Sequence, residues 1–362
     1  MYVLENLAMI KVLIVDDSSF MRVKIRSFLE TCPDIKTVGI ARNGLDAVEK
    51  THILMPDVIT MDINMPGLSG IQAVERIMRE CPTRILIVSS LAYEGAAETL
   101  EALEKGAVDY IHKDTMTEKI LVDKIRMAMD AVITPLPPCT DNVFTAAEDT
   151  RPSIKKILER EMQSLDHVVP QNPFRLVAIG ISTGGPKALA SIIPQISPDI
   201  RASIVVGQHM PAAFTRPLAE RLDKESRIRV KEAEDGEPLL PGCVYICPGG
   251  MHVMFQKKDI ISLYPKENFH EYHYCPSADL LMASASLTYG RSALLIIMTG
   301  MGSDGMEGIK AARIQGSYVL AQSEETSTIY GMPKAVISNN LQNEIVHLGQ
   351  IAERINQLCS EG

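Results

Sequence analysis

Short, almost purely apolar runs alternate with stretches of helical periodicity near the start of the chain, and this alternation restricts the fold more than any other feature. Five such runs lie between residues 10 and 132, at 11–15, 37–41, 58–61, 85–88 and 110–112. Most of them carry few polar residues, which is typical of parallel strands covered by helices on both faces. The pattern predicts a doubly wound α/β domain at residues 10–132, with its binding site at the carboxyl ends of the strands.

The same alternation resumes at residue 173, so a second doubly wound α/β domain is predicted at residues 173–362. Apolar runs at 176–181, 204–208 and 294–299 are each followed by a polar turn and a helical pattern. Residues 226–275 interrupt this pattern with short β-like pieces and predict an inserted hairpin region. Proline-bounded residues 133–172 are predicted to be a linker, in which apolar residues at helical spacing indicate one short helix at 153–165.

Charge and cysteine content exclude several classes of protein. The net charge of −9 is shared by both predicted domains, so neither is basic enough to grip a phosphate backbone and nucleic-acid binding is not expected. The seven cysteines are scattered and form no Cys-x-x-Cys pair, which indicates a reducing compartment. With no apolar run of membrane-spanning length and no export signal, we expect a cytoplasmic protein that does not insert into membranes.

Acidic residues follow the first and third predicted strands. Asp16 and Asp17 end the first strand, Asp62 ends the third, and Lys113 follows the fifth. Because these strand ends converge, the carboxylates would repel one another unless a hard cation such as Mg²⁺ bound there. Asp62 could then accept a phosphoryl group, with Lys113 and the Ser89 hydroxyl holding the transferred oxygens. A single aspartate in such a place is often only a helix N-cap, but three with a lysine favour a site.

These segments resemble the receiver domain of two-component response regulators. The motifs are Val15-Asp16-Asp17, Met61-Asp62-Ile63-Asn64-Met65-Pro66-Gly67, Val88-Ser89-Ser90 and Tyr110-Ile111-His112-Lys113. The resemblance implies that Asp62 accepts phosphate from a histidine kinase and that Ser89 and Tyr110 report phosphorylation to the output face. It also implies Mg²⁺ bound by Asp16, Asp17, Asp62 and the Asn64 carbonyl. The family usually has a cis proline after the lysine, whereas here Asp114 follows. A cis bond without proline costs about 2.5–4 kcal/mol, so a trans bond is expected.

A glycine-rich turn follows the first strand of the second domain. It reads Gly-Ile-Ser-Thr-Gly-Gly over residues 180–185, a Gly-x-Ser-x-Gly pattern that would raise the Ser182 hydroxyl at a helix N-terminus. A serine in such a turn is also a common helix N-cap, so this motif alone does not establish a nucleophile. A nucleophilic serine needs a base and an orienting acid, and His209 and Asp304 follow the strands at 204–208 and 294–299. Three strand ends would therefore bring a triad together, with the backbone N–H groups of Thr183 and Met301 as candidate oxyanion donors.

A second glycine-rich turn keeps another class of function open. Residues 300–305 satisfy Gly-x-Gly-x-x-Gly after a strand, so the second domain could be a non-catalytic output domain that binds a nucleotide or a partner. Asp304 would set a negative charge beside the pyrophosphate, which disfavours that interpretation. His270, His273 and Cys275 lack a fourth ligand at a zinc spacing, so an exposed loop beside the active site is expected there instead.

The motifs of the second domain look like those of the catalytic domain of chemotaxis protein-glutamate methylesterases. They are residues 179–186, Gln208-His209-Met210-Pro211, Pro248-Gly249-Gly250 with His252, Pro276-Ser277-Ala278-Asp279 and residues 298–305. The resemblance implies a phosphorylation-activated serine hydrolase that demethylates glutamate methyl esters on chemoreceptors and releases methanol. Ser182, His209 and Asp304 would form its triad, and no cofactor is expected in this domain. Members of the family often also deamidate receptor glutamines. Methylated chemoreceptors would be the substrate and a chemotaxis histidine kinase the phosphodonor, and the receiver domain would cover the Ser182 edge until Asp62 is phosphorylated.

Overall fold

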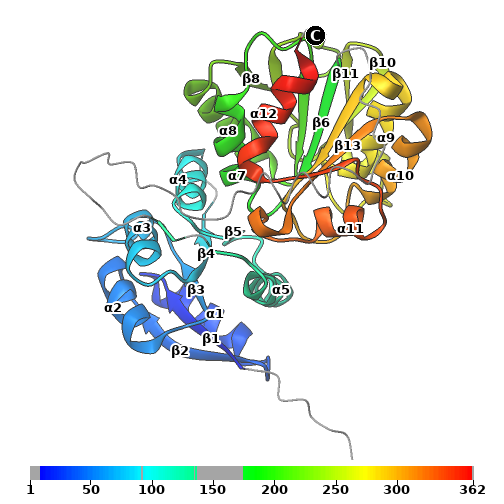
Figure 1. Cartoon of the computed structure of the whole chain (residues 1–362). Coiled ribbons are helices and arrows are strands. Elements are labelled where there is room, and N and C mark those ends of the chain that lie inside the picture. The colour runs from blue at the N-terminus through cyan, green and yellow to red at the C-terminus, as the bar shows by residue number, and fades with distance from the viewer. Residues whose placement is uncertain (1–8, 91–92, 134, 137–173, 361–362) are drawn as a thin grey trace, which may run out of the picture.

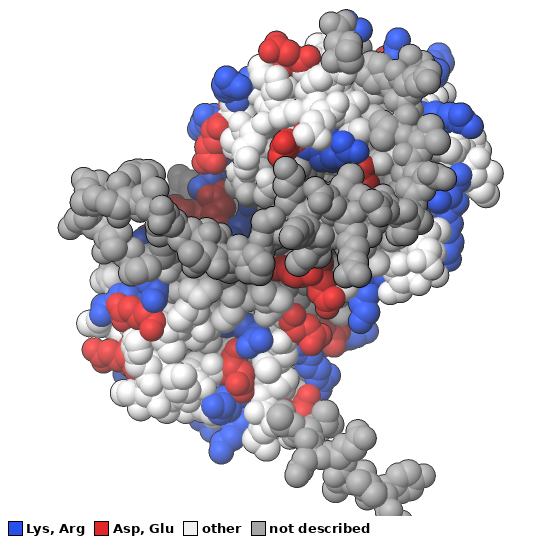
Figure 2. Space-filling model, viewed as in Figure 1, with Lys and Arg blue, Asp and Glu red and all other residues white. Residues whose placement is uncertain are grey.

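The computed structural model describes residues 9–90, 93–133, 135–136 and 174–360, which fold into two α/β domains (Figure 1). The helix predicted at 153–165 lies outside the described residues. Within those residues, no helix is both long enough and apolar enough to cross a bilayer. On the face drawn in Figure 2, basic and acidic side chains are interspersed over both domains.

The first domain contains a five-stranded parallel sheet in the order β2-β1-β3-β4-β5. Its strands are β1 Ile10–Val15, β2 Ile35–Ala41, β3 Val58–Met61, β4 Arg84–Ser89 and β5 Asp109–His112. The five helices of this domain are α1 Ser19–Leu29, α2 Gly44–Leu54, α3 Gly70–Glu80, α4 Tyr93–Glu104 and α5 Glu118–Met129. Helices α1 and α5 pack on one face of the sheet and α2 and α3 on the other, which confirms the predicted doubly wound arrangement.

The second domain contains a seven-stranded parallel sheet in the order β14-β13-β12-β6-β7-β9-β8. Its strands are β6 Leu176–Ile181, β7 Ser203–Gln208, β8 Arg229–Glu232, β9 Cys243–Ile246, β12 Ala293–Ile297, β13 Tyr318–Gln322 and β14 Glu344–Val346. The helices are α7 Gly185–Ile192, α8 Ala212–Glu225, α9 Ala278–Tyr289, α10 Met306–Gln315, α11 Met332–Ser338 and α12 Leu348–Cys359. Four 3₁₀ turns complete it: η1 Ile193–Gln195, η2 Lys266–Asn268, η3 Gly290–Ser292 and η4 Glu324–Thr326.

The region predicted as an inserted hairpin is more varied than expected. Strands β10 Met251–Lys257 and β11 Ile260–Pro265 form an antiparallel hairpin, as predicted. Strands β8 and β9 instead extend the main sheet in parallel beyond β7. The reason is burial: every residue of β9 is buried, and the sheet supplies the hydrogen-bond partners that its backbone needs there.

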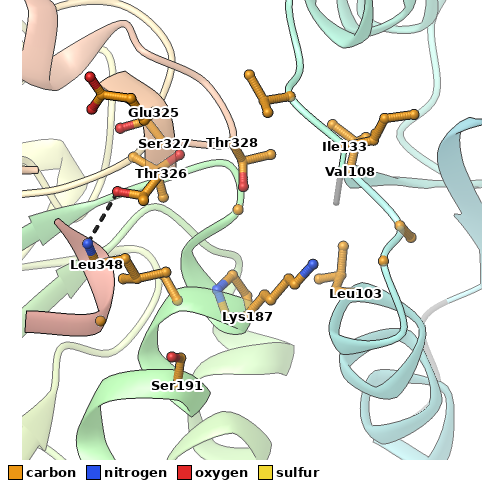
Figure 3. Close-up of a pocket in the computed structure, with 18 of the residues that line it drawn as sticks. Leu103, Val108, Ile133, Lys187, Ser191, Glu325, Thr326, Ser327, Thr328 and Leu348 are labelled. Atoms are coloured by element: carbon orange, nitrogen blue, oxygen red, sulfur yellow. Dashed lines mark hydrogen bonds between the residues drawn. The ribbon is translucent and has the colours of Figure 1, made fainter. Parts of the chain in front are cut away.

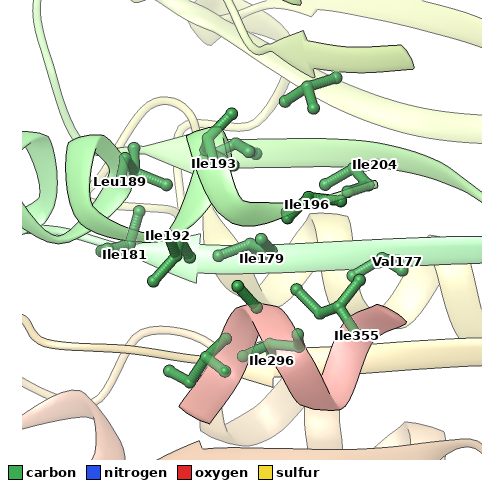
Figure 4. Packing of buried hydrophobic residues seen from close by; sticks show 14 of the residues in the cluster. Val177, Ile179, Ile181, Leu189, Ile192, Ile193, Ile196, Ile204, Ile296 and Ile355 are labelled. Carbon is green, nitrogen blue, oxygen red and sulfur yellow. The ribbon is translucent and has the colours of Figure 1, made fainter. Parts of the chain in front are cut away.

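Helices α7 and α12 bury one face of the second sheet around β6. Figure 4 shows Ile179 and Ile181 of β6 facing Ile192 of α7, with Ile355 of α12 packed on the same face. Burying each such side chain stabilises the fold by about 1.5–3 kcal/mol. This packing fixes the position of β6 within the sheet, and therefore the position of Ser182, which follows it.

The first domain contacts the second through α4 and β5. Ala96 and Leu100 of α4 belong to the same buried cluster as the inner residues of α7 and α8, and α4 packs on both helices. The ring of Tyr110 in β5 lies against Phe214 of α8, with 4.7 Å between ring centroids. The two domains therefore share a buried apolar cluster.

Candidate active site and phosphorylation site

Ser182 lies where the order of strands in the second sheet changes direction. It follows β6, whose neighbours are β7 on one side and β12 on the other, and crevices at such points hold the ligands of open α/β sheets. Gly184, with φ of 80°, turns the chain sharply from Ser182 into α7. Gly300 packs directly against the serine, because a Cβ added at Gly300 would lie 2.6 Å from Ser182 Cβ. Gly184 and Gly300 are thus required because the two loops that contain them approach their neighbours closely.

His209 follows β7, the next strand along this edge. Its Nε2 atom lies 2.7 Å from Asp304 Oδ2. Its Nδ1 atom is buried and has no hydrogen-bond partner among the described residues. The imidazole stacks on the ring of Tyr274, with centroids 4.3 Å apart and planes 4° from parallel. One ring nitrogen is therefore held by an acid, while the other remains available to accept a proton.

Asp304 is held at the N-terminus of α9. Its Oδ2 atom accepts from the Ala278 N–H at 2.7 Å, and its Oδ1 atom accepts from the N–H groups of Asp279 at 3.0 Å and Gly305 at 3.1 Å and from the Ser277 hydroxyl at 3.1 Å. Burial disfavours the charged carboxylate, but hydrogen bonding to His209 and to these amides outweighs it. The pKa of Asp304 therefore lies below its ordinary value. The site holds this acid ionised and in a fixed orientation.

Asp279 occupies the amides that a nucleotide would need. Its Oδ1 atom accepts from the N–H groups of Gly305 and Gly308, at 2.9 Å each, at the start of α10. Burial raises the pKa of Asp279, and the neighbouring Asp304 charge adds to this rise. The Gly-x-Gly-x-x-Gly turn is therefore already capped by a carboxylate of the protein, and a bound pyrophosphate is not favoured.

Ser182 and His209 line one cavity of about 410 Å³, together with Thr183 and Met301. No hydrogen bond between Ser182 Oγ and His209 is present within the described residues. Catalytic hydrogen bonds are often long in enzymes without substrate and tighten only in the complex. Gln208 fixes the serine turn, because its Nε2 atom donates to the Ser182 carbonyl at 3.0 Å. The structure thus brings the four predicted residues around one space.

The cavity is closed on its other side by the first domain. Asp109 and Tyr110 of β5 and Lys124 of α5 line it. The Thr183 hydroxyl donates to Asp109 Oδ2 at 3.0 Å, and Lys124 Nζ lies 2.6 Å from the same oxygen. The residue after Ser182 is therefore bonded directly to the first domain.

The acidic cluster forms at the carboxyl ends of β1 and β3 in the first domain. Carboxylate oxygens of Asp16, Asp17 and Asp62 all lie within 4.8 Å of one another. Lys113 Nζ lies 3.0 Å from Asp16 Oδ2 and 2.9 Å from Asp62 Oδ2. Burial raises the pKa of Asp62 in spite of Lys113. Burial also acts to lower the pKa of Lys113, but the two carboxylates outweigh it and raise that pKa.

The other predicted residues of this domain are more dispersed. Asn64 is exposed beside the cluster. The Ser89 hydroxyl is buried and shares a 3.0 Å hydrogen bond with Thr99 of α4. The one cis peptide bond among the described residues precedes Pro276, so the bond before Asp114 is trans. Ser89 thus contacts the helix that faces the second domain.

Sequence reasoning missed several residues of the interface and of the site. Asp109 is a buried strand residue, and no sequence pattern reveals that it contacts Thr183. Tyr274 was expected only as part of an exposed loop, which is confirmed for His270 and His273, and it also covers His209. Ser277 was a detectable N-cap signal, since it precedes the helical pattern of α9.

Both domains match known families. Residues 177–355 match the CheB methylesterase family, and residues 12–126 match the response regulator receiver domain family. The "Protein-glutamate methylesterase/protein-glutamine glutaminase 1" of Oleidesulfovibrio alaskensis is 43% identical, over 96% of this chain and 98% of that protein. A protein of the same kind from Pseudomonas putida is 40% identical over 97% of this chain and 99% of its own length. One from Thermotoga maritima is 39% identical over 96% of this chain and 98% of its own length. The chain therefore belongs to the protein-glutamate methylesterase/protein-glutamine glutaminase family, with a receiver domain ahead of its CheB methylesterase domain.

Proposed function

We propose that this protein is a phosphorylation-activated serine hydrolase that removes methyl esters from glutamates on the cytoplasmic signalling helices of chemoreceptors. The observation that carries this proposal is the 2.7 Å contact between His209 Nε2 and Asp304 Oδ2 beside Ser182, at the point where the strand order reverses. It supplies a base with a fixed orientation next to a candidate nucleophile. The full-length relatives named for this activity support the choice of ester.

In the acylation step, Ser182 Oγ attacks the γ-carbonyl carbon of the glutamyl ester while His209 Nδ1 accepts the hydroxyl proton. The Asp304 carboxylate stabilises the imidazolium that forms. The backbone N–H groups of Thr183 and Met301 are our candidates to bind the oxyanion, and each such donor is worth about 2.7–4 kcal/mol in comparable sites. Collapse of the intermediate breaks the C–O bond, and His209 returns its proton to the departing methoxide as methanol.

In the deacylation step, a water molecule replaces the serine as nucleophile. His209 accepts a proton from the water, hydroxide adds to the acyl carbon, and the proton returns to Ser182 Oγ as the ester bond breaks. The product is the free glutamate. The same acyl-enzyme would form from a receptor glutamine if ammonia left in place of methanol, so deamidation requires no additional residue.

The receiver domain, which we assign to residues 10–132, would control access to this site. Asp62 would accept the phosphoryl group from a chemotaxis histidine kinase, with Lys113 and Ser89 holding its oxygens. The carboxylates of Asp16, Asp17 and Asp62, with the Asn64 carbonyl, suit Mg²⁺, because the set is oxygen-only and its charges are crowded within 4.8 Å. Bound Mg²⁺ would neutralise charge on the incoming phosphoryl group.

The regulatory contact in this proposal is the interface over the Ser182 cavity. Residues 133–172 would tether the receiver domain to the catalytic domain at 173–362. While the receiver domain lines the cavity, a receptor helix cannot reach Ser182. Phosphorylation would shift Ser89 and Tyr110, which contact α4 and α8, and so weaken the interface.

Methanol release from membranes that contain methylated chemoreceptors tests both domains. We expect acetyl phosphate with Mg²⁺ to raise the rate for the wild-type protein. Ser182→Ala should abolish release and still incorporate phosphate, whereas Asp62→Asn should retain the basal rate and lose the response to acetyl phosphate. Methanol release that survives in Ser182→Ala would refute the proposed nucleophile.

A further inference from the structure

Helix α4 of the receiver domain packs against both α7 and α8 of the catalytic domain, and we call the surface that these two helices present to it the α7–α8 groove. Its apolar contacts come from Ala96, Leu100 and Leu103, which are spaced at i, i+4 and i+7. The first two are fully buried in the core cluster of the catalytic domain. Leu103 lines the Ser182 cavity and a second cavity between the two domains. This is how an amphipathic peptide helix binds in a groove of another protein. The α7–α8 face is therefore already shaped to accept a helix.

Two cations of the catalytic domain flank the last turn of α4. Arg221 of α8 forms ion pairs with Glu104 and, within its own helix, with Glu225. Lys187 lies in the first turn of α7 and lines a cavity of about 310 Å³ beside Leu103. Figure 3 shows its side chain reaching across that cavity toward Leu103 and Val108, while the carboxylate of Glu325 points away from it. Within the described residues, Lys187 has neither an ion pair nor a side-chain hydrogen bond.

These cations contribute little to holding the receiver domain in place. Burial raises the pKa of Glu104 to about 7 even though Arg221 opposes the rise, so removing the carboxylate from water costs more than the pair returns. Burial likewise lowers the pKa of Lys187, and no anion among the described residues offsets it. A surface that served only to bind α4 would need neither cation, because well-packed apolar residues in place of buried charges are often neutral or stabilising. The cations therefore suit a partner other than the receiver domain.

We propose that the α7–α8 groove is the docking site for the substrate helix, with Lys187 and Arg221 binding carboxylates that flank the reactive glutamyl ester, and that α4 occupies it by mimicking that helix. The inference rests on the proposed function, because it takes a helical, glutamate-rich segment as substrate. Helix α4 has this chemistry: its sequence, YEGAAETLEALE, contains four glutamates and neither lysine nor arginine.

The two cations lie at one end of the surface that α4 covers. Lys187 follows Ser182 by five residues, whereas Arg221 lies nine residues into α8, which begins beside His209. Both cations lie beside the last turn of α4, so they would contact carboxylates near one end of a docked helix. The occupant predicted from α4 carries apolar residues at i, i+4 and i+7 and an acidic residue at i+8.

Steady-state kinetics with the acetyl-phosphate-treated full-length protein test this proposal. The substrates are an acidic amphipathic peptide helix with one glutamyl γ-methyl ester, the same peptide with its other glutamates changed to glutamine, and N-acetylglutamate γ-methyl ester amide. We expect wild-type KM to be about tenfold lower for the acidic peptide than for the neutral one, and the difference to shrink in high salt. Lys187→Gln and Arg221→Gln should each raise KM for the acidic peptide about tenfold, with kcat unchanged and the small ester unaffected.

Two variants separate docking from closure of the domains. Glu104→Gln breaks the same ion pair from the receiver side and should leave KM for the acidic peptide at or below the wild-type value. Arg216→Gln removes an exposed arginine of α8 that pairs with Glu220, and should change neither constant. Equal KM values in Arg221→Gln and Glu104→Gln, or equal KM for the acidic and neutral peptides in wild type, would overturn the proposal.

Failure of the proposed function gives a different pattern, in which wild type cleaves none of the three esters. Docking is then decided by fluorescence anisotropy with the unesterified acidic peptide. Binding that Lys187→Gln weakens would uphold the docking site, and equal binding by the wild type and Lys187→Gln would overturn it.

Discussion

Replacing Asp304 by asparagine tests the catalytic assignment with the least change of shape. The new side chain would keep one acceptor oxygen, which can still serve the amides of Asp279 and Gly305. Its NH₂ group would then face the Ala278 N–H and His209 Nε2, where a carboxylate oxygen now accepts at 2.7 Å from both. His209 would have to present Nε2 as an acceptor and carry its proton on Nδ1. The nitrogen that should receive the serine proton would therefore already be occupied.

The expected loss of activity follows from this wrong tautomer. In serine hydrolases of the same chemistry it lowers kcat by about 10⁴-fold, which is about 5 kcal/mol of transition-state stabilisation. One or two buried donors would also lose their acceptor, at about 1–3 kcal/mol each, so the free energy of unfolding should fall by about 1–6 kcal/mol. Steady-state methanol release and urea unfolding of the same preparation measure the two effects.

Asp279→Asn is the matched control, since it makes the same chemical change in a neighbouring carboxylate. Asp279 bonds to the amides of Gly305 and Gly308 but not to His209, and an asparagine oxygen can still accept from both. Its kcat should stay within about tenfold of wild type, because the loss of charge at a helix N-terminus is worth only about 0.3–1 kcal/mol. If folded Asp304→Asn retains a kcat within tenfold of wild type, or if both variants lose activity equally, the proposed role of Asp304 is wrong.

Three further outcomes are expected. Gly300→Ala should lower kcat by about 100-fold, because the new methyl group would displace Ser182, whereas Gly349→Ala, whose nearest neighbour would be 3.8 Å away, should leave kcat unchanged in the same assay. When the receiver domain packs on the catalytic domain, the pKa of Glu104 is about 7, above its ordinary value of about 4.3. Protonation of Glu104 therefore favours this closed arrangement, which strengthens as pH falls through 7 and is weakest above it. Basal activity should fall more between pH 8 and 6 in wild type than in Glu104→Gln, and parallel pH profiles would contradict this. Tyr110→Ala removes an aromatic contact with Phe214 that is worth about 0.5–1.5 kcal/mol beyond its buried area. Basal methanol release without phosphodonor should therefore rise by roughly twofold to tenfold. An unchanged rate would show that this ring does not hold the domains together.

The strands were predictable because their signal is local. Each buried run in the sequence became a strand, and the observed ends differ by one or two residues where side chains intervene. The last predicted strand ends at Ile297 rather than Thr299, because the Thr299 N–H donates to the side chain of Gln322 and not to a neighbouring strand. Strands β8 and β9 were not separable from a hairpin, since the pairing of β9 with β7 joins residues far apart in the sequence, and β8 then pairs with β9.

The candidate site was predictable only in part. The placement of Ser182, His209 and Asp304 at one edge follows from the parallel sheet, in which the carboxyl ends of all strands meet. Which ring nitrogen of His209 contacts Asp304 does not follow from the sequence, because it depends on where the N-terminus of α9 holds Asp304. The contact of Asp109 with Thr183 joins residues 74 positions apart, and neither residue type announces it.

The brevity of β5 has a consequence for signalling. The strand runs only from Asp109 to His112; its first residue accepts the hydrogen bond from Thr183, and the residue after its last is Lys113, which holds Asp62. A strand of four residues is about 13 Å long. Asp62 and the loop that follows Ser182 are therefore separated by one strand and one side-chain contact at each end. A change at Asp62 can therefore reach the catalytic domain through β5, the edge strand of the receiver sheet, which lies between Lys113 and the Thr183 contact.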